Sequence, residues 1–221
     1  MTWEHFEQTA TRYEAWYQTR AGRRVSQAER LLLRRLLRQF PSSASALEIG
    51  CGTAHFTRWL AGGRLEAFGL DRSPAMLAEA RRLAPGLPLV RADAQRLPVR
   101  DRCVDLALLV TTLEFLASPF DALQEAVRIA RTGVIVVALN RWSIGGLSRR
   151  WGPKARGELL RHAQDFSLPR LRAMLCSAAK HRLREARWAS AVFPAPFHRA
   201  SPPIPFGGVL AVTAALEDAR E

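Results

Sequence analysis

The sequence has few cysteines, very little lysine and no long apolar run, and each shortage excludes a class of protein. Cys51, Cys103 and Cys176 lie far apart and form no C-x-x-C pair. This argues against a disulfide framework and a metal site, and it favours a reducing compartment such as the cytoplasm. The longest apolar stretch, FGGVLAVTAAL at 206–216, is too short to span a bilayer. The N-terminal stretch mixes acidic and polar residues, unlike a secretory signal.

Lysine occurs only at Lys154 and Lys180, so arginine carries nearly all of the positive charge behind the net charge of +13. Such a basic chain could bind nucleic acid or an anionic membrane. The arginines are spread along the chain, however, as expected if they solvate helix faces. We therefore do not expect nucleic acid as a partner, and we keep a peripheral contact with an anionic membrane as an alternative. The sequence does not indicate an oligomeric state.

Apolar runs of strand length alternate with helical patterns through the first two thirds of the chain. Strands are predicted at 45–50, 66–71, 87–93, 103–111 and 133–140, with helices at 55–62, 73–86 and 118–132 between them. The run 133–140 is almost continuously apolar, which is typical of a strand buried on both faces of a parallel sheet. This alternation predicts an α/β fold, a Rossmann-like doubly wound sheet that is mostly parallel.

The remaining segments predict additions to this core. The leucines of 26–40 recur on one face and the arginines on the other, which indicates an amphipathic helix packed on the sheet. A helix at 167–180 and two strands within 183–193 and 207–216 would complete a sheet of about seven strands, with an antiparallel C-terminal edge. We expect a single domain composed of an N-terminal helical lid, a cofactor-binding core, a cap insertion and a C-terminal part, at 1–40, 41–140, 141–166 and 167–221.

A glycine turn follows the first predicted strand, in ALEIGCGTAHFT. Gly50 and Gly52 let backbone N–H groups approach a ligand at the start of a helix. A dinucleotide fingerprint, G-x-G-x-x-G/A, would need Gly or Ala where His55 stands. The bulky imidazole obstructs a pyrophosphate, so a nicotinamide oxidoreductase is a distant alternative.

Acidic residues follow at strand ends. Asp71 ends the second strand, where a carboxylate can accept both hydroxyls of a ribose, and Asp93 ends the third. The series of Glu48, Gly50, Gly52, Asp71 and Asp93, with LPVRDRCVD after the third strand, resembles class I S-adenosylmethionine-dependent methyltransferases of the small-molecule type. The resemblance covers roughly residues 13–140. The family's third glycine is replaced by Ala54, which fits if the backbone there is helical.

The resemblance implies S-adenosyl-L-methionine as the cofactor and assigns residues to it. The backbone of Gly50, Cys51 and Gly52 would face the methionine part, with Glu48 before it as a further cofactor-site residue. Asp71 would hold the ribose, and Arg72 and Met76 would flank the adenine. Asp93 would accept from the adenine amine, with Ala94 beside it, and the backbone at Val110 and Thr111 would lie under the sulfonium. Tyr13 and Tyr17 belong to a segment that looks like the family's lid, although packing is an equally good interpretation of both tyrosines.

Glu114, in VTTLEF after the fourth strand, is the candidate catalytic residue. It stands where this family often places residues under the methyl-transfer site, so we predict a general base or an acceptor-orienting role. A helix N-terminal acid or a structural salt bridge is the alternative. Histidines in the variable region, His162 and His198, are weaker candidates.

The predicted acceptor is a small or lipid-like molecule. TTLEF lacks the prolines of amino-methylating nucleic-acid enzymes, no cysteine has the context of a cytosine-C5 nucleophile, and Val110 stands where catechol-type enzymes place metal-binding acids. Trp142 and Trp151, with nearby arginines, would line a pocket mouth that suits a quinone precursor, a phospholipid headgroup or a small carboxylate. An RNA or other macromolecular acceptor, and a catalytically decayed cofactor-binding regulatory protein, remain as alternatives.

Overall fold

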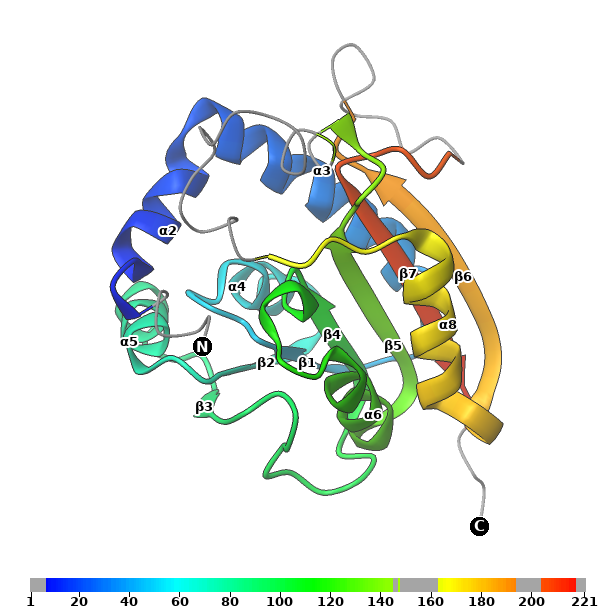
Figure 1. Cartoon of the computed structure of the whole chain (residues 1–221). Helices are drawn as coiled ribbons and strands as arrows, with labels where there is room; N and C mark the ends of the chain where they lie inside the picture. The colour runs from blue at the N-terminus through cyan, green and yellow to red at the C-terminus, as the bar shows by residue number, and fades with distance from the viewer. Residues whose placement is uncertain (1–6, 145–146, 148–162, 194–203, 218–221) are drawn as a thin grey trace.

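The computed structural model describes residues 7–144, 147, 163–193 and 204–217 (Figure 1). A seven-stranded sheet has the order β3-β2-β1-β4-β5-β7-β6. The first five strands pair in parallel, β7 is antiparallel to β5, and β6 is antiparallel to β7. This confirms the predicted doubly wound, mostly parallel sheet with an antiparallel C-terminal edge. The strands are β1 (Ser45–Ile49), β2 (Glu66–Asp71), β3 (Leu89–Arg91), β4 (Val104–Val110), β5 (Ala130–Leu139), β6 (Leu183–Ala191) and β7 (Val209–Leu216).

Helices cover both faces of this sheet. Those described are α2 (Ala10–Gln18), α3 (Arg20–Leu37), α4 (His55–Ala61), α5 (Pro74–Leu83), α6 (Pro119–Ile129) and α8 (Leu168–Ala179), with short 3-10 turns η1 (Leu113–Phe115) and η3 (Lys180–Arg182). Serine and proline open α5 as predicted: Ser73 Oγ accepts a hydrogen bond from the Met76 amide, and Pro74 occupies the first turn. No helix within the described ranges is long and apolar enough to cross a membrane.

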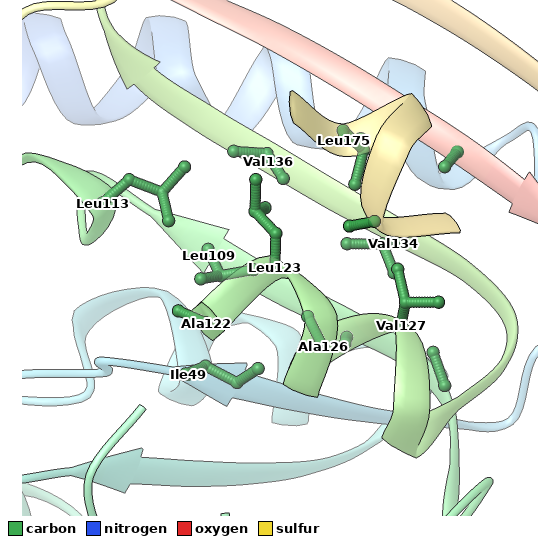
Figure 2. Close-up of a cluster of buried hydrophobic side chains, with 14 of the residues drawn as sticks. Ile49, Leu109, Leu113, Ala122, Leu123, Ala126, Val127, Val134, Val136 and Leu175 are labelled. Atoms are coloured by element: carbon green, nitrogen blue, oxygen red, sulfur yellow. The ribbon is translucent and has the colours of Figure 1, made fainter. Parts of the chain in front are cut away.

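The larger hydrophobic core lies between the sheet and the α6–α8 layer. Figure 2 shows side chains of α6 and Leu175 of α8 lying over residues of β4 and β5. Leu109, Leu123, Val134 and Val136 are fully buried there. Because β4 and β5 are buried on both faces, their sequences are nearly continuous apolar runs. This core fixes the carboxyl end of β4, where the candidate catalytic residue follows.

The second core lies on the opposite face, under α3 and α4. Leu32, Leu33 and Leu36 of α3 are buried there with the strand-end residues Val110 and Val137, whereas Arg34 and Arg35 point to solvent. The predicted amphipathic helix is thus confirmed, but it begins at Arg20, earlier than predicted, because Thr19 Oγ1 accepts a hydrogen bond from the Gly22 amide and caps it. The early part of α3 lies beside the start of α4, where Ser26 Oγ is 2.8 Å from Nε2 of His55.

Candidate functional site

The glycine turn after β1 is shaped by backbone that favours residues without a side chain. Gly50 and Gly52 have φ of +73° and +55°, in the left-handed region. The amides of Gly50 and Cys51 both donate to the Leu70 carbonyl, at 2.7 and 2.8 Å. These bonds hold the turn across the end of β2, next to Asp71.

The two glycines are required for different reasons. A Cβ on Gly50 would lie 2.2 Å from Cγ2 of Thr112, whose hydroxyl donates to the Ile49 carbonyl at 3.0 Å. Gly50 is therefore needed for packing against the segment after β4. A Cβ on Gly52 would meet only the Tyr13 ring at 3.7 Å and the Met76 sulfur at 3.9 Å. The bare Cα of Gly52 thus faces the space between two residues that the sequence predicted to contact the cofactor.

Ala54 differs from its prediction. Its backbone has φ 59° and ψ 34°, which is left-handed and not part of the right-handed helix that starts at His55. The family's third glycine therefore stands at a position where glycine is favoured sterically, and alanine there costs about 1 kcal/mol. The methyl group is fully buried in a cluster with Leu77 and Ala80.

Asp71 is fixed by the turn that it borders. Its two carboxylate oxygens accept hydrogen bonds from the Gly52 amide at 2.7 Å and from the Ser73 amide at 2.8 Å. Burial raises the pKa of Asp71 although these backbone bonds oppose the shift. Each carboxylate oxygen has a second lone pair, so Asp71 can also accept from the hydroxyls of a ligand.

Asp93 lies at the neighbouring strand end, as predicted. The Ala92 amide donates to the Asp71 carbonyl at 3.0 Å, which brings the ends of β2 and β3 together. The Arg72 guanidinium reaches Asp93 Oδ2 at 3.1 Å, and Oδ1 accepts from the Gln95 amide at 2.9 Å. Ala94 is buried beside it. The two carboxylates therefore lie at the ends of neighbouring strands, and the Arg72 side chain is paired with Asp93.

The end of β4 carries a strained residue. Thr111 has φ +50°, which is unusual for a β-branched side chain, and its amide donates to the Val137 carbonyl at 2.8 Å. Val110 before it is buried. Strained backbone of this kind persists where the surrounding structure enforces it, and it is concentrated at functional sites.

The N-terminal helix α2 is attached directly to the glycine turn. Glu14 accepts hydrogen bonds from Thr53 Oγ1 and from the Arg58 guanidinium, both at 2.6 Å. Burial opposes ionisation of Glu14, but its bonds to His55, Thr53 and Arg58 lower its pKa to about 2. Sequence analysis missed Glu14 because its partners lie more than thirty positions away.

The two tyrosines of α2, Tyr13 and Tyr17, differ in their burial and in the residues that they contact. Their hydroxyls lie 3.2 Å apart, and burial raises the pKa of both above the usual range. The Tyr17 ring is buried and stacks on the His55 ring with centroids 3.6 Å apart, so it packs α2 onto α4. Tyr13 is only partly buried and lies over Gly52. Of the two tyrosines, Tyr13 is the one whose ring lies next to Gly52.

Glu48 and Cys51 are buried beside the turn. Glu48 accepts a hydrogen bond from the Thr57 hydroxyl at 2.5 Å, and burial raises its pKa to about 8. The Cys51 sulfur packs near Gly69 of β2, and burial raises the pKa of its thiol well above the usual range. Glu48 is therefore engaged with α4, and Cys51 can offer a ligand its backbone and not its thiol.

Glu114 lies in the turn η1 after β4. It is almost fully buried, and one of its carboxylate oxygens accepts from the Leu139 amide at 2.5 Å. Its carbonyl accepts from the Gln164 amide at 2.9 Å. Glu114 thus connects the ends of β4 and β5, which agrees with the structural alternative and also places a carboxyl group at the predicted methyl-transfer edge.

Some predicted residues cannot be compared with the structure. Trp151, His162 and His198 lie outside the described residues, as does most of the predicted cap. Trp142 is exposed after β5. Within the described ranges no group of three or more His, Cys, Asp or Glu side chains could hold a metal ion.

Residues 47–138 match the model of a methyltransferase domain family. The chain is 35% identical over 133 residues to a malonyl-[acyl-carrier protein] O-methyltransferase of Pectobacterium atrosepticum, covering 58% of this chain and 52% of that protein. The Enterobacter lignolyticus protein of the same name is 32% identical over 152 residues, covering 66% of this chain and 59% of the relative. The chain thus spans between half and three fifths of the length of these curated relatives.

A solved structure from Thermotoga maritima covers nearly the whole fold. It is described as a SAM-dependent methyltransferase and possible histamine N-methyltransferase, and it is 25% identical with a TM-score of 0.79 over 97% of this chain and 99% of its own. The local geometry fits the cofactor of such proteins: the bare Gly52 Cα leaves room beside Tyr13 and Met76, and carboxylates suit ribose hydroxyls and a positively charged ligand. Residues 47–138 are therefore similar in sequence to methyltransferase domains, and the fold of the chain is similar to that of a class I S-adenosylmethionine-dependent methyltransferase.

Proposed function

We propose that this protein transfers a methyl group from S-adenosylmethionine to a small-molecule or lipid-like acceptor. The observation that carries the proposal is the arrangement around Gly52. Its amide holds Asp71, while its bare Cα faces Tyr13 and Met76. A flat or extended ligand that lies on this turn would meet a carboxylate, an aromatic ring and a thioether at once.

Each residue of the site has a distinct role in this proposal. Asp71, already oriented by two backbone amides, accepts from the ribose hydroxyls, and Asp93 accepts from the adenine amine. Arg72 and the buried Met76 border the adenine. The bound cofactor supplies an activated methyl group on a positively charged sulfur. The backbone at Val110 and Thr111 lies below this position.

The lid residues exclude water and fix the reacting partners. Tyr13 covers Gly52, and Glu14 ties the helix that carries Tyr13 to Thr53 and Arg58. Holding a nucleophile and a methyl group together in the absence of water supplies much of the acceleration in such a reaction. Glu114, at the ends of β4 and β5, orients the acceptor or takes its proton.

Cofactor binding is the first test. Titration calorimetry of the purified chain with S-adenosylmethionine, S-adenosylhomocysteine and NAD should show binding of the first two and none of the third. Binding of NAD alone would contradict the proposal and favour an oxidoreductase.

Turnover is the second test. Cell extracts fractionated by size and polarity, scored for S-adenosylhomocysteine production, should yield an acceptor in a small-molecule or lipid fraction. Turnover confined to an RNA fraction would contradict a small-molecule or lipid-like acceptor and identify RNA as the acceptor instead. Cofactor binding with no turnover in any fraction would favour a catalytically decayed regulatory protein.

A further inference from the structure

His55 is the first residue of α4, directly after the glycine turn, and it contacts both N-terminal helices. From α3, Ser26 Oγ lies 2.8 Å and Arg30 Nη2 lies 3.1 Å from Nε2 of the imidazole. From α2, the Tyr17 ring stacks on the imidazole with centroids 3.6 Å apart and an interplanar angle of 7°. Glu14 of α2 approaches the other nitrogen, with Oε1 3.9 Å from Nδ1. The imidazole therefore joins α2 and α3 to the end of the turn.

These contacts determine which protonation state of His55 fits the site. A guanidinium only donates hydrogen bonds, so Nε2 of His55 must accept from Arg30 and carries no proton. The ring is therefore neutral, with its proton on Nδ1, the nitrogen that faces Glu14. Protonation of Nε2 would remove the acceptor and place a positive charge against Arg30. Burial and the charges of Arg30 and Arg58 lower the pKa of His55, although Glu14 opposes the shift.

The contacts of His55 continue to the cofactor side of the turn. The Tyr17 and Tyr13 hydroxyls lie 3.2 Å apart. A Cβ built on Gly52 would lie 3.7 Å from the Tyr13 ring. We propose that neutral His55 is a positioning residue that holds α2, and with it Tyr13, over the bound cofactor, and that acid releases this hold. The inference rests on the cofactor site proposed above.

The direction of the pH effect follows from the burial of the ring. When α2 detaches, His55 is exposed to water and its pKa returns toward the ordinary value of about 6.5. The attached form takes up this proton less readily, so a fall in pH through about 6.5 favours detachment. The neighbours do not titrate in this range: Glu14 has a pKa of about 2, the pKa of Tyr17 is raised by burial, and arginine side chains stay protonated. His55 is therefore the titrating group among these contacts.

Hydrogen exchange of the wild-type chain without cofactor tests the hold on α2. After correction for the intrinsic rate, exchange of α2 amides should rise about fivefold or more from about pH 7.5 to about pH 5.5. Exchange in β5, in the middle of the sheet, should rise by less than about twofold. No rise in α2, or an equal rise in α2 and β5, would overturn the inference.

Two variants separate the imidazole from its neighbours. In H55Q the side-chain amide oxygen can still accept from Arg30 but takes up no proton in this range, so the acid-induced rise in α2 exchange should disappear. S26A removes one partner of Nε2 and should speed α2 exchange about threefold or more at about pH 7.5 while keeping the rise in acid. H181Q replaces an exposed histidine of η3 and should behave like wild type. A full rise in H55Q, or unchanged exchange in S26A, would contradict the role of His55.

Calorimetry with S-adenosylhomocysteine connects this hold to the cofactor site. Wild-type affinity should fall about threefold or more from about pH 7.5 to about pH 5.5, and the fall should be smaller in H55Q. Asp71 is present in both chains, so the difference between the two pH profiles belongs to His55. Equal profiles would show that the hold on α2 does not serve the cofactor. Failure of wild type to bind at about pH 7.5 would instead contradict the methyl-transfer function, while α2 exchange still tests the positioning role.

Discussion

At the scale of single residues, the two glycines of the turn should respond differently to the same substitution. Gly50→Ala places a methyl group 2.2 Å from Cγ2 of Thr112 and keeps φ at +73°, so we expect it to lower the free energy of unfolding by about 3 kcal/mol. Gly52→Ala meets no atom closer than 3.7 Å and should cost about 1 kcal/mol from backbone strain.

For cofactor affinity we expect the reverse: the substitution of Gly52 should matter more than that of Gly50. In Gly52→Ala the new methyl group fills the space between Tyr13 and Met76, so we expect at least about tenfold weaker binding of S-adenosylmethionine in a chain that stays folded. Denaturant unfolding and calorimetry measure the two effects. Binding at the wild-type level in this variant would show that the cofactor does not lie on the turn.

Asp71 has a structural and a binding role, which an amide substitution can separate. Asp71→Asn keeps one oxygen acceptor for the backbone of Gly52 or Ser73 and removes the negative charge. We expect cofactor affinity to fall about tenfold or more, because a charged acceptor binds hydroxyls more strongly than a neutral one. Calorimetry measures this loss, and Asp121→Asn, on the exposed first turn of α6, is the matched control. A variant that binds like wild type would remove Asp71 from the ribose site.

Which residues could be predicted from the sequence depends on whether their partners are near in the chain. Gly50, Gly52 and Asp71 belong to a motif with fixed local spacing, and the structure brings them together. Thr112 is the residue against which Gly50 packs, but the contact spans more than sixty positions and leaves no local pattern. Glu29 lies on a helix whose sequence pattern is simply amphipathic, and that pattern gave no signal that this acid would be buried.

At the scale of elements, Glu14 forms the hydrogen bonds and the ion pair that join α2 to Thr53 of the turn and to Arg58 of α4. Glu14→Gln removes the ion pair with Arg58 and weakens the bond from Thr53, so we expect a loss of about 2 kcal/mol in stability and faster proteolysis within α2. Cofactor affinity should fall with it, since Tyr13 is carried by the same helix. Limited proteolysis with mass spectrometry locates the cleavage, and Glu79→Gln, on the exposed ion pair of α5, is the control.

Strands and helices were predicted well where the spacing of apolar residues and the capping or turn residues indicated the same element. Every predicted strand was found, and Ser73–Pro74 marked the start of α5. The predicted helix began at residue 26, whereas α3 begins at Arg20 and includes Gly22. The lack of a side chain at Gly22 allows contact with the backbone of α2: a Cβ there would lie 2.1 Å from the Trp16 carbonyl oxygen. The reason for such a glycine is visible only when the second helix is in place.

At the scale of the whole molecule, the buried acids make stability depend on pH. Burial raises the pKa of Glu29 and of Glu48 to about 8, whereas an unfolded glutamate titrates near about 4.3. Between these values the folded protein binds more protons than the unfolded chain, so the free energy of unfolding falls as pH rises through about 5 to 8. The lowered pKa of His55, caused mainly by burial, acts in the other direction, but only as pH falls below about 6.5.

Thermal unfolding without cofactor should therefore begin at a lower temperature at about pH 9 than at about pH 7. Glu29→Gln should reduce that difference, because the glutamine needs no proton to be buried in neutral form. Glu66→Gln, exposed on β2, should leave it unchanged. A difference that is equally large in Glu29→Gln would mean that the acid is already ionised in the folded protein.

The strand order has a consequence for how the protein is made. β7 comes last among the described strands, yet it lies inside the sheet, hydrogen-bonded to β5 on one side and to β6 on the other. A ribosome that has synthesised everything up to β6 has therefore released a strand with no neighbour to pair with and left the edge of β5 uncovered. Such edges invite aggregation, so completion of the sheet must await the final strand, and chaperones that shield nascent chains should matter most in that interval.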